Sequence, residues 1–172
     1  MNSKTEVISR PHVWLLVMTV VVFTSASFAQ STGSETQETS GKQFAQFPDN
    51  TLTPEQVVRG QLEALRNNGP TDGGIAICFR FASPNNQRNT GPLPRFVKMI
   101  KSGVYRLMLE YREAEYGVVE IINNRARQRV TLTSATQSIS FVFYLSKQQH
   151  ESCKDCWMTD SVAIERIHSK SA

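Results

Sequence analysis

Cysteine, tryptophan and histidine are scarce in this chain, and the sequence contains no familiar catalytic motif. The 172 residues include three cysteines, two tryptophans and three histidines. There is no nucleophile elbow, phosphate-cradling glycine loop or dinucleotide fingerprint, and Gly73-Gly74 is too short to count as one. The sequence therefore argues against the hydrolases, nucleotide-binding proteins and dehydrogenases that carry those motifs, and it predicts no catalytic residue and no cofactor.

A strong charge of either sign is also missing. The chain has 19 basic and 15 acidic side chains, a net charge of +4. A net charge this small does not indicate that the protein binds a nucleic acid or a membrane surface. Arg125, Arg127 and Arg129 alternate and would share one face of a strand, either as an anion-binding stripe or as a solvated outer face. Because no aromatic residues lie between them for base stacking, we favour the outer face and predict no nucleic-acid partner.

Residues 13–23, VWLLVMTVVVF, form an apolar run too short to cross a bilayer, which takes about 20 residues of helix. Lys4 and Arg10 precede the run, and small residues at Ser27 and Ala29 follow it. This pattern is typical of a signal peptide cleaved before Gln30. We therefore expect an exported protein, periplasmic or secreted, without a membrane partner after cleavage. The alternative is an uncleaved anchor.

The sequence divides into four parts. Residues 1–29 are the predicted signal peptide. Residues 30–51 are predicted to be a disordered leader, because residues 30–43 have no large apolar side chain. Residues 52–168 are predicted to form one domain, and residues 169–172 a tail.

Three helices are expected at the start of the domain. Thr53 precedes proline, with Gln56 three residues on, which is the pattern of a capping box, and this helix ends at residues 67–70. The second is an apolar run capped by Asp72, for which a strand is the alternative. The third begins at Leu93 or Pro94 and ends before Ser102-Gly103.

Alternating patterns after residue 105 predict strands. We expect them at residues 106–116, 117–123, 127–135, 138–147 and 157–167. The fourth has the clearest pattern, with Ile139, Phe141, Phe143 and Leu145 on one face. Helices followed by antiparallel strands indicate an α+β domain of three N-terminal helices packed on a curved sheet of four to five strands.

Three segments resemble an uncharacterised family, domain of unknown function 4864. They are TPEQVVRGQLEALRNN, FRFASPNNQRNTGPLPRFVKMI and CWMTDSV. The resemblance extends over about residues 53–167. It implies a cone-shaped fold like that of nuclear transport factor 2, in the cystatin-like group. The family has no established activity, so the resemblance implies a fold and little more.

The polar stretch NNQRNT after Ser83-Pro84 is predicted to be a rigid loop between the second and third helices. The alternative is a lid over a ligand. Gly91, Pro92 and Pro94 favour the rigid loop.

A cone would enclose a pocket. Its candidate lining residues are the polar or amphipathic Tyr105, Glu110, Tyr111, Tyr144, Trp157 and Asp160. We expect a non-catalytic domain that either binds a small apolar or amphipathic ligand or forms a homodimer through the sheet face, where Val142 and Tyr144 interrupt a serine-rich pattern. The alternative is a small pocket enzyme, a lyase, isomerase or hydrolase, although Asp160 has no identifiable acid–base partner.

Cys153 and Cys156 are the most visible pair of reactive side chains. They could form a disulfide in a hairpin loop, remain two thiols, exchange electrons, or bind zinc together with His150 and a fourth ligand. We favour the disulfide or the two thiols and predict no metal. Cys78 lies in an apolar run and is predicted to be a buried free thiol.

Overall fold

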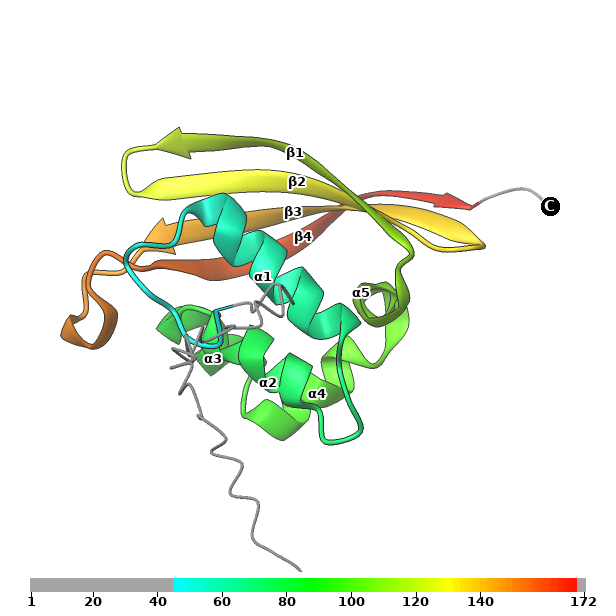
Figure 1. Ribbon diagram of the computed structural model, residues 1–172, viewed down its shortest axis with the longest axis horizontal. Coiled ribbons are helices and arrows are strands. Elements are labelled where there is room, and N and C mark those ends of the chain that lie inside the picture. The colour runs from blue at the N-terminus through cyan, green and yellow to red at the C-terminus, as the bar shows by residue number, and fades with distance from the viewer. Residues whose placement is uncertain (1–44, 170–172) are drawn as a thin grey trace, which may run out of the picture. The chain divides into compact units, whose positions relative to one another are not determined.

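The computed structural model describes residues 45–169, which form an α+β domain with its helices on one face of an antiparallel sheet (Figure 1). The helices are α1 (Pro54–Arg66), α2 (Gly73–Arg80), α3 (Pro84–Thr90), α4 (Leu93–Ile100) and α5 (Leu107–Glu110), with 3-10 turns at η1 (Gly103–Arg106) and η2 (Glu151–Cys153). The strands are β1 (Glu113–Ile122), β2 (Arg125–Thr133), β3 (Gln137–Lys147) and β4 (Trp157–Ser169), in the order β1-β2-β3-β4. The α+β class is confirmed. Residues 45–169 contain five α-helices, where three were expected.

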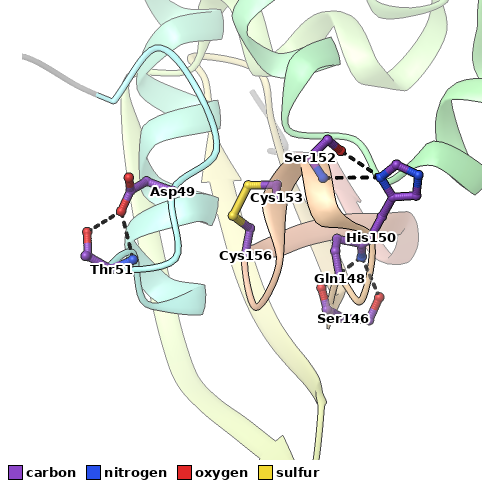
Figure 2. Close-up of a disulfide and its surroundings, with 8 residues drawn as sticks. All are labelled: Asp49, Thr51, Ser146, Gln148, His150, Ser152, Cys153 and Cys156. Carbon is purple, nitrogen blue, oxygen red and sulfur yellow. Dashed lines mark hydrogen bonds between the residues drawn. A yellow bond between two sulfur atoms is a disulfide. The ribbon is translucent and has the colours of Figure 1, made fainter.

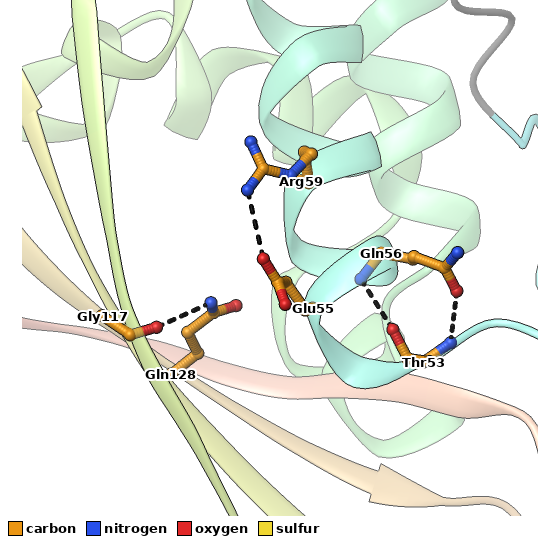
Figure 3. A network of polar contacts seen from close by, with 6 residues as sticks. All are labelled: Thr53, Glu55, Gln56, Arg59, Gly117 and Gln128. Carbon is orange, nitrogen blue, oxygen red and sulfur yellow. Dashed lines mark hydrogen bonds and ion pairs between the residues drawn. The ribbon is translucent and has the colours of Figure 1, made fainter.

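Helix α1 begins at the capping box that the sequence predicts. The backbone N–H of Thr53 donates to Oε1 of Gln56 at 2.8 Å, and the backbone N–H of Gln56 donates to Oγ1 of Thr53 at 3.2 Å (Figure 3). The helix ends at Asn67, whose side-chain amide donates to the carbonyl of Glu63 at 2.8 Å. Local side chains thus satisfy backbone groups at both ends of the helix.

Asp72 precedes α2 but does not cap it, contrary to the prediction. Its φ is 60°, and its carboxylate instead binds Nζ of Lys101 at 2.7 Å. The hydrogen bond from Lys101, followed by one from Asn68, lowers the pKa of Asp72 below its ordinary value. Oδ1 of Asn68 accepts from the backbone N–H of Ile75 at 3.1 Å, so the cap of α2 comes from the end of α1.

The polar stretch after Ser83 is a helix, α3, where a loop was expected. Oγ of Ser83 accepts from the backbone N–H of Asn86 at 3.3 Å, and Pro84 occupies the first helical turn. The pattern of cap followed by proline is the same as at Thr53-Pro54. Gln87 fixes α3 in place, since its side-chain amide donates to the carbonyls of Phe79 and Ala82 at 3.1 and 2.9 Å.

The two expected strands at residues 106–116 and 117–123 are in fact one strand, β1, preceded by the helical residues 103–110. The register of β1 against β2 shifts between Tyr116 and Val119. Such a bulge lets a strand continue where its alternation fails. The carbonyl of Gly117 lies in this bulge and accepts from Nε2 of Gln128 at 3.0 Å (Figure 3).

Strand β3 forms the centre of the core, as predicted. Ile139, Phe141, Phe143 and Leu145 are each at most 2% exposed. Leu62 of α1, fully buried, belongs to the same core cluster. The helical layer therefore shields the apolar face of the sheet from water, which is the main source of stability in such a two-layer fold.

Residues 45–52 make specific contacts with the domain. Ala45 and Leu52 pack against the core. The guanidinium of Arg80 donates to the carbonyl of Gln46 at 3.0 Å and lies 4.6 Å from the centre of the Phe47 ring. The predicted signal peptide and most of the predicted leader lie outside the described residues. Between residues 45 and 169, no helix combines the length and apolar character needed to cross a bilayer.

Candidate ligand pocket

A cavity of about 160 Å³ lies between the helices and β4. Every helix of the described domain and two strands contribute to its wall. The lining residues are Gln61, Leu65, Cys78, Ala82, Asn86, Thr90, Phe96, Met99, Ile100, Tyr105, Met108, Phe143, Thr159, Ser161 and Val162.

The cavity has a buried, largely apolar floor that also includes Gln61 and Thr159, and a partly exposed mouth with both polar and apolar side chains. Leu65, Cys78 and Phe143 are buried and contribute carbon and sulfur to the floor. Thr90 and Tyr105 are only half-buried, and Ser161 is exposed. A molecule in the cavity could therefore place an apolar body inside and a polar end toward water.

Gln61 joins three walls of the cavity by hydrogen bonds. Its Nε2 donates to the carbonyl of Cys78 at 3.3 Å, and its Oε1 accepts from Oγ1 of Thr159 at 2.7 Å. These bonds connect α1 to α2 and to β4. Because Gln61 and Thr159 are each 2% exposed, this is a buried polar link that water does not compete for.

The mouth is held by a second set of hydrogen bonds. Nδ2 of Asn86 donates to the carbonyl of Thr159 at 3.0 Å, and Oγ1 of Thr90 donates to the carbonyl of Asn86 at 2.8 Å. The hydroxyl of Tyr105 donates to the carbonyl of Val162 at 3.3 Å. Helix α3 is therefore tied to β4 on one side of the mouth, and η1 is tied to β4 on another.

The lining side chains are mostly apolar, with a few amide and hydroxyl groups. Burial raises the pKa of the Cys78 thiol to about 12, so it stays protonated at neutral pH and is a poor nucleophile. None of the residues that line the cavity is a carboxylate or a histidine. Elsewhere in residues 45–169, no cluster of three or more potential metal ligands occurs.

Of the residues expected in the pocket, the structure brings only Tyr105 to the cavity. Tyr111 and Trp157 are buried in the core, and Tyr144 lies on the outer face of the sheet, where it pairs in register with Arg127. Asp160 lies where the register of β4 shifts between Tyr144 and Leu145, in a bulge. A further candidate, Glu110, binds Arg106 at 3.4 Å on the surface.

Tyr111 belongs to a row of aromatic and cationic side chains beside α1. The guanidinium of Arg66 lies 5.2 Å from the centre of its ring, and that of Arg59 lies 4.0 Å from the ring of Tyr116. Desolvation raises the pKa of both tyrosines above the ordinary value. Both phenols therefore remain protonated at neutral pH, and the row is a packing contact of the cation–π kind.

Cys153 and Cys156 are joined in a disulfide within the loop between β3 and β4 (Figure 2). In the same loop, Nδ1 of His150 accepts from the backbone N–H of Ser152 at 3.3 Å. The imidazole therefore organises the loop, and the sulfur atoms are bonded to each other. Cys78 is the buried free cysteine that the sequence predicts.

The three alternating arginines lie on the exposed face of β2, as expected. Arg127 binds Glu120 at 2.8 Å, and Arg129 binds Glu165. Hydrogen bonds to these carboxylates raise the pKa of both arginines, and the bond from Arg129 lowers the pKa of Glu165. Two of the three cations are thus paired with acids, one on the adjacent β1 and one on β4 beyond β3, which fits a solvated face better than an anion-binding stripe.

Sequence reasoning missed Gln61, Asn86, Thr90, Thr159 and Ser161 as pocket residues. Gln61 alone carried a usable signal. It lies four residues after Val57 and four before Leu65, so it occupies the apolar stripe of α1. A polar side chain in that position must find a buried partner.

Neither the curated proteins nor the solved structures include a match to this chain. The sequence profile of one family, described as "Domain of unknown function (DUF4864)", matches residues 48–172. That match includes every helix and strand of the described domain and all fifteen residues that line the cavity. The chain therefore belongs to the DUF4864 family.

Proposed function

We propose that this domain binds a small apolar or amphipathic molecule in the cavity between its helices and β4, without transforming it. The observation that carries the proposal is a cavity with a buried, largely apolar floor that includes Leu65, Cys78 and Phe143, and a partly exposed mouth that includes Thr90 and Tyr105. Ligand sites are typically concave and apolar with a few oriented polar groups.

The size of the cavity limits the ligand. At about 160 Å³ the cavity is close to the roughly 150 Å³ of an engineered apolar cavity that accepts benzene. A single ring or a short aliphatic chain therefore fits, whereas a steroid or a nucleotide does not.

The alternative, a small enzyme using the same cavity, has less support. General acid–base catalysis needs a titratable group within hydrogen-bond reach of the substrate. Tyr105 and Cys78 are the titratable side chains in the lining, and the hydroxyl of Tyr105 already donates to the carbonyl of Val162. Cys78 is protonated because burial raises its pKa.

A second function, pairing of two copies through the outer face of the sheet, is favoured by apolar side chains there. Val118 and Ile122 are 87% and 74% exposed, and Tyr144 is 40% exposed. Val142, on the same face as Tyr144, is paired in register with Ala163. In residues 45–169 all helices lie on the opposite face, so no described segment covers these side chains (Figure 1).

One pair of neighbouring substitutions separates the two functions. Val162→Phe fills the mouth of the cavity, whereas Ala163→Phe adds the same ring on the outer face, because successive residues of a strand point to opposite sides. We expect Val162→Phe to weaken binding of benzyl alcohol at least about tenfold, since the added ring occupies the ligand's volume. Isothermal titration calorimetry gives the affinity and light scattering the mass.

Ala163→Phe is the matched control for binding, and it should leave the affinity for benzyl alcohol unchanged. If two copies pair through the outer face, this variant should change the proportion of dimer that light scattering detects. Equal affinities of wild type and Val162→Phe would contradict the cavity as the binding site. A wild type that is monomeric at high concentration would contradict pairing.

We further propose that the domain is related to the cone fold of nuclear transport factor 2-like proteins. Helices on one face of an antiparallel sheet, with a cavity between the two layers, support this relation. An experimental structure in which the sheet is flat and the cavity is filled by side chains would contradict it.

We also propose that the protein is exported and cleaved before Gln30. The disulfide between Cys153 and Cys156 supports this, because disulfides persist mainly in oxidising compartments. We expect the purified natural protein to have the mass of the 143 residues that begin at Gln30, with two hydrogens fewer than the reduced form. Intact-mass spectrometry of a fractionated cell checks both. A full-length chain in the cytoplasmic fraction would refute export.

A further inference from the structure

Charge is unevenly distributed along the domain. Residues 73–109 contain six cationic side chains, Arg80, Arg88, Arg95, Lys98, Lys101 and Arg106, and no aspartate or glutamate. The rest of residues 45–169 holds nine cations and twelve anions. Residues 73–109 therefore carry a net charge of +6, whereas the rest of residues 45–169 carries −3.

That segment is the one that builds the cavity. It comprises α2, α3, α4, η1 and most of α5, and it supplies nine of the fifteen lining residues. Helix α4 carries both cavity-lining residues and cations. Its residues Phe96, Met99 and Ile100 line the cavity, and Arg95 and Lys98 belong to the same two helical turns. The cations thus lie on the elements that line the cavity, but none of them is a lining residue.

Four of these six cations have no acidic partner in the described part of the chain. Lys101 binds Asp72, Arg106 binds Glu110, and Arg80 contacts the backbone of Gln46 and the ring of Phe47.

The other three cations are Arg88, Arg95 and Lys98. Arg88 donates to Oδ1 of Asn85 at 3.3 Å, and Arg95 donates to the carbonyl of Gly91 at 3.4 Å. Both acceptors are neutral, so three positive charges on α3 and α4 remain unneutralised by protein groups.

We propose that the ligand of this cavity is an anionic amphiphile, with an apolar body of about one ring or a short chain in the floor and an anionic head at the mouth. The inference rests on the proposed binding function and adds the charge of the ligand. The head belongs at the mouth because the floor has no cation to offset the cost of burying a charge.

The cations on α4 can attract an anionic head at the mouth without contacting it, and the effect on the binding constant can be estimated. The Debye length is about 10 Å at 0.1 M salt, comparable to the length of the eight-residue α4, so cations on this helix are felt at the mouth. A single exposed cation about 10 Å from an anion in water changes the binding constant by roughly twofold. Asp160, between the lining residues Thr159 and Ser161, carries the opposite charge and reduces the attraction of an anion.

The test compares probes that share a shape and differ in charge: benzoate, benzyl alcohol and benzylammonium, with hexanoate and hexanol as the chain series. At low salt we expect benzoate to bind about three times more tightly than benzyl alcohol, and benzylammonium to bind most weakly. At about 1 M NaCl, where the Debye length is about 3 Å, the three affinities should converge. Calorimetry on the mature protein provides the values.

Two variants with equal loss of charge complete the test. Arg95→Gln with Lys98→Gln should weaken benzoate about two- to fourfold at low salt and leave benzyl alcohol unchanged. Arg125→Gln with Lys154→Gln, in β2 and the β3–β4 loop, should change neither, since neither residue lies on an element around the mouth.

Benzyl alcohol or hexanol binding as tightly as its carboxylate would overturn the anionic ligand while leaving the binding function intact. Failure of all five probes to bind would overturn both. An equal loss of benzoate affinity in the two double variants would show that net charge alone is responsible, and it would overturn the assignment of the head to the mouth.

Discussion

Replacing Gly74 with alanine is expected to destabilise the domain by about 3 kcal/mol, at the upper end of the usual cost of overpacking a core. A Cβ atom at this position would lie 2.0 Å from the carbonyl oxygen of Ala64 and 3.0 Å from the Cα of Asn68. Both atoms belong to the backbone, so no side chain can rotate away. The start of α2 would have to move off the end of α1.

That movement also reaches the cavity. Leu65 follows Ala64 in α1, and Cys78 lies one turn after Gly74 in α2, and both line the floor. We therefore expect Gly74→Ala to lose affinity for small ligands as well as stability. Urea denaturation gives the free energy of unfolding, and calorimetry with benzyl alcohol gives the affinity.

Gly60 provides the matched control. It lies in the middle of α1, and a Cβ there would meet nothing within 4 Å. Gly60→Ala should therefore stabilise the domain by about 0.5–1 kcal/mol, because alanine loses less backbone entropy in a helix than glycine does. If the two variants changed stability by the same amount, the close approach of α2 to α1 would be wrong.

The elements that the sequence predicts correctly are those whose determinants are local. Thr53, Pro54 and Gln56 lie within four residues, and their capping box fixes the start of α1. Phe141 and Phe143 alternate with outward residues in β3, and this periodicity alone places them in the core. In both segments, neighbouring residues are sufficient to identify the element and its buried face.

Helix α3 was missed because its stability is not encoded in an apolar face. None of its residues is buried, and Gln87 and Asn86 fix it by bonding carbonyls of Phe79 and Thr159. The second of these partners is 73 positions away. A polar segment of this kind looks like a loop unless the cap at Ser83 is given the same weight as the one at Thr53.

The pocket was only partly predictable for a related reason. Aromatic residues were predicted to line the pocket, but Trp157 and Tyr111 are buried in the core instead. The polar residues that do line it, such as Gln61 and Thr159, come from elements 98 positions apart. Only the packing of α1 against β4 brings them together.

Exchanging Gln61 for leucine is expected to cost about 2 kcal/mol, although the two side chains are similar in size. The Thr159 hydroxyl would lose its acceptor in a site that is 2% exposed, and a buried unsatisfied group of this kind costs about 1–3 kcal/mol. The carbonyl of Cys78 would keep the hydrogen bond from the backbone N–H of Phe81 at 3.1 Å. The hydroxyl therefore accounts for most of the loss.

Thr159→Val removes the hydroxyl itself and provides the matched partner for a double-mutant cycle. Alone, it leaves Oε1 of Gln61 without a donor and should also destabilise the domain. Together, the two substitutions remove both polar groups, and replacing both partners by apolar groups is often close to neutral. We expect the double variant to be more stable than the sum of the single losses predicts by about 1–2 kcal/mol.

The cycle also tests whether the cavity owes its shape to this buried link. Gln61 connects the wall from α1 to those from α2 and β4, so each single variant should speed amide hydrogen exchange in α2 and around Thr159. The double variant should return exchange toward the wild-type rate, because apolar contacts replace the lost bonds. Strictly additive losses would mean that Gln61 and Thr159 act independently, and the cavity walls would then be held by packing alone.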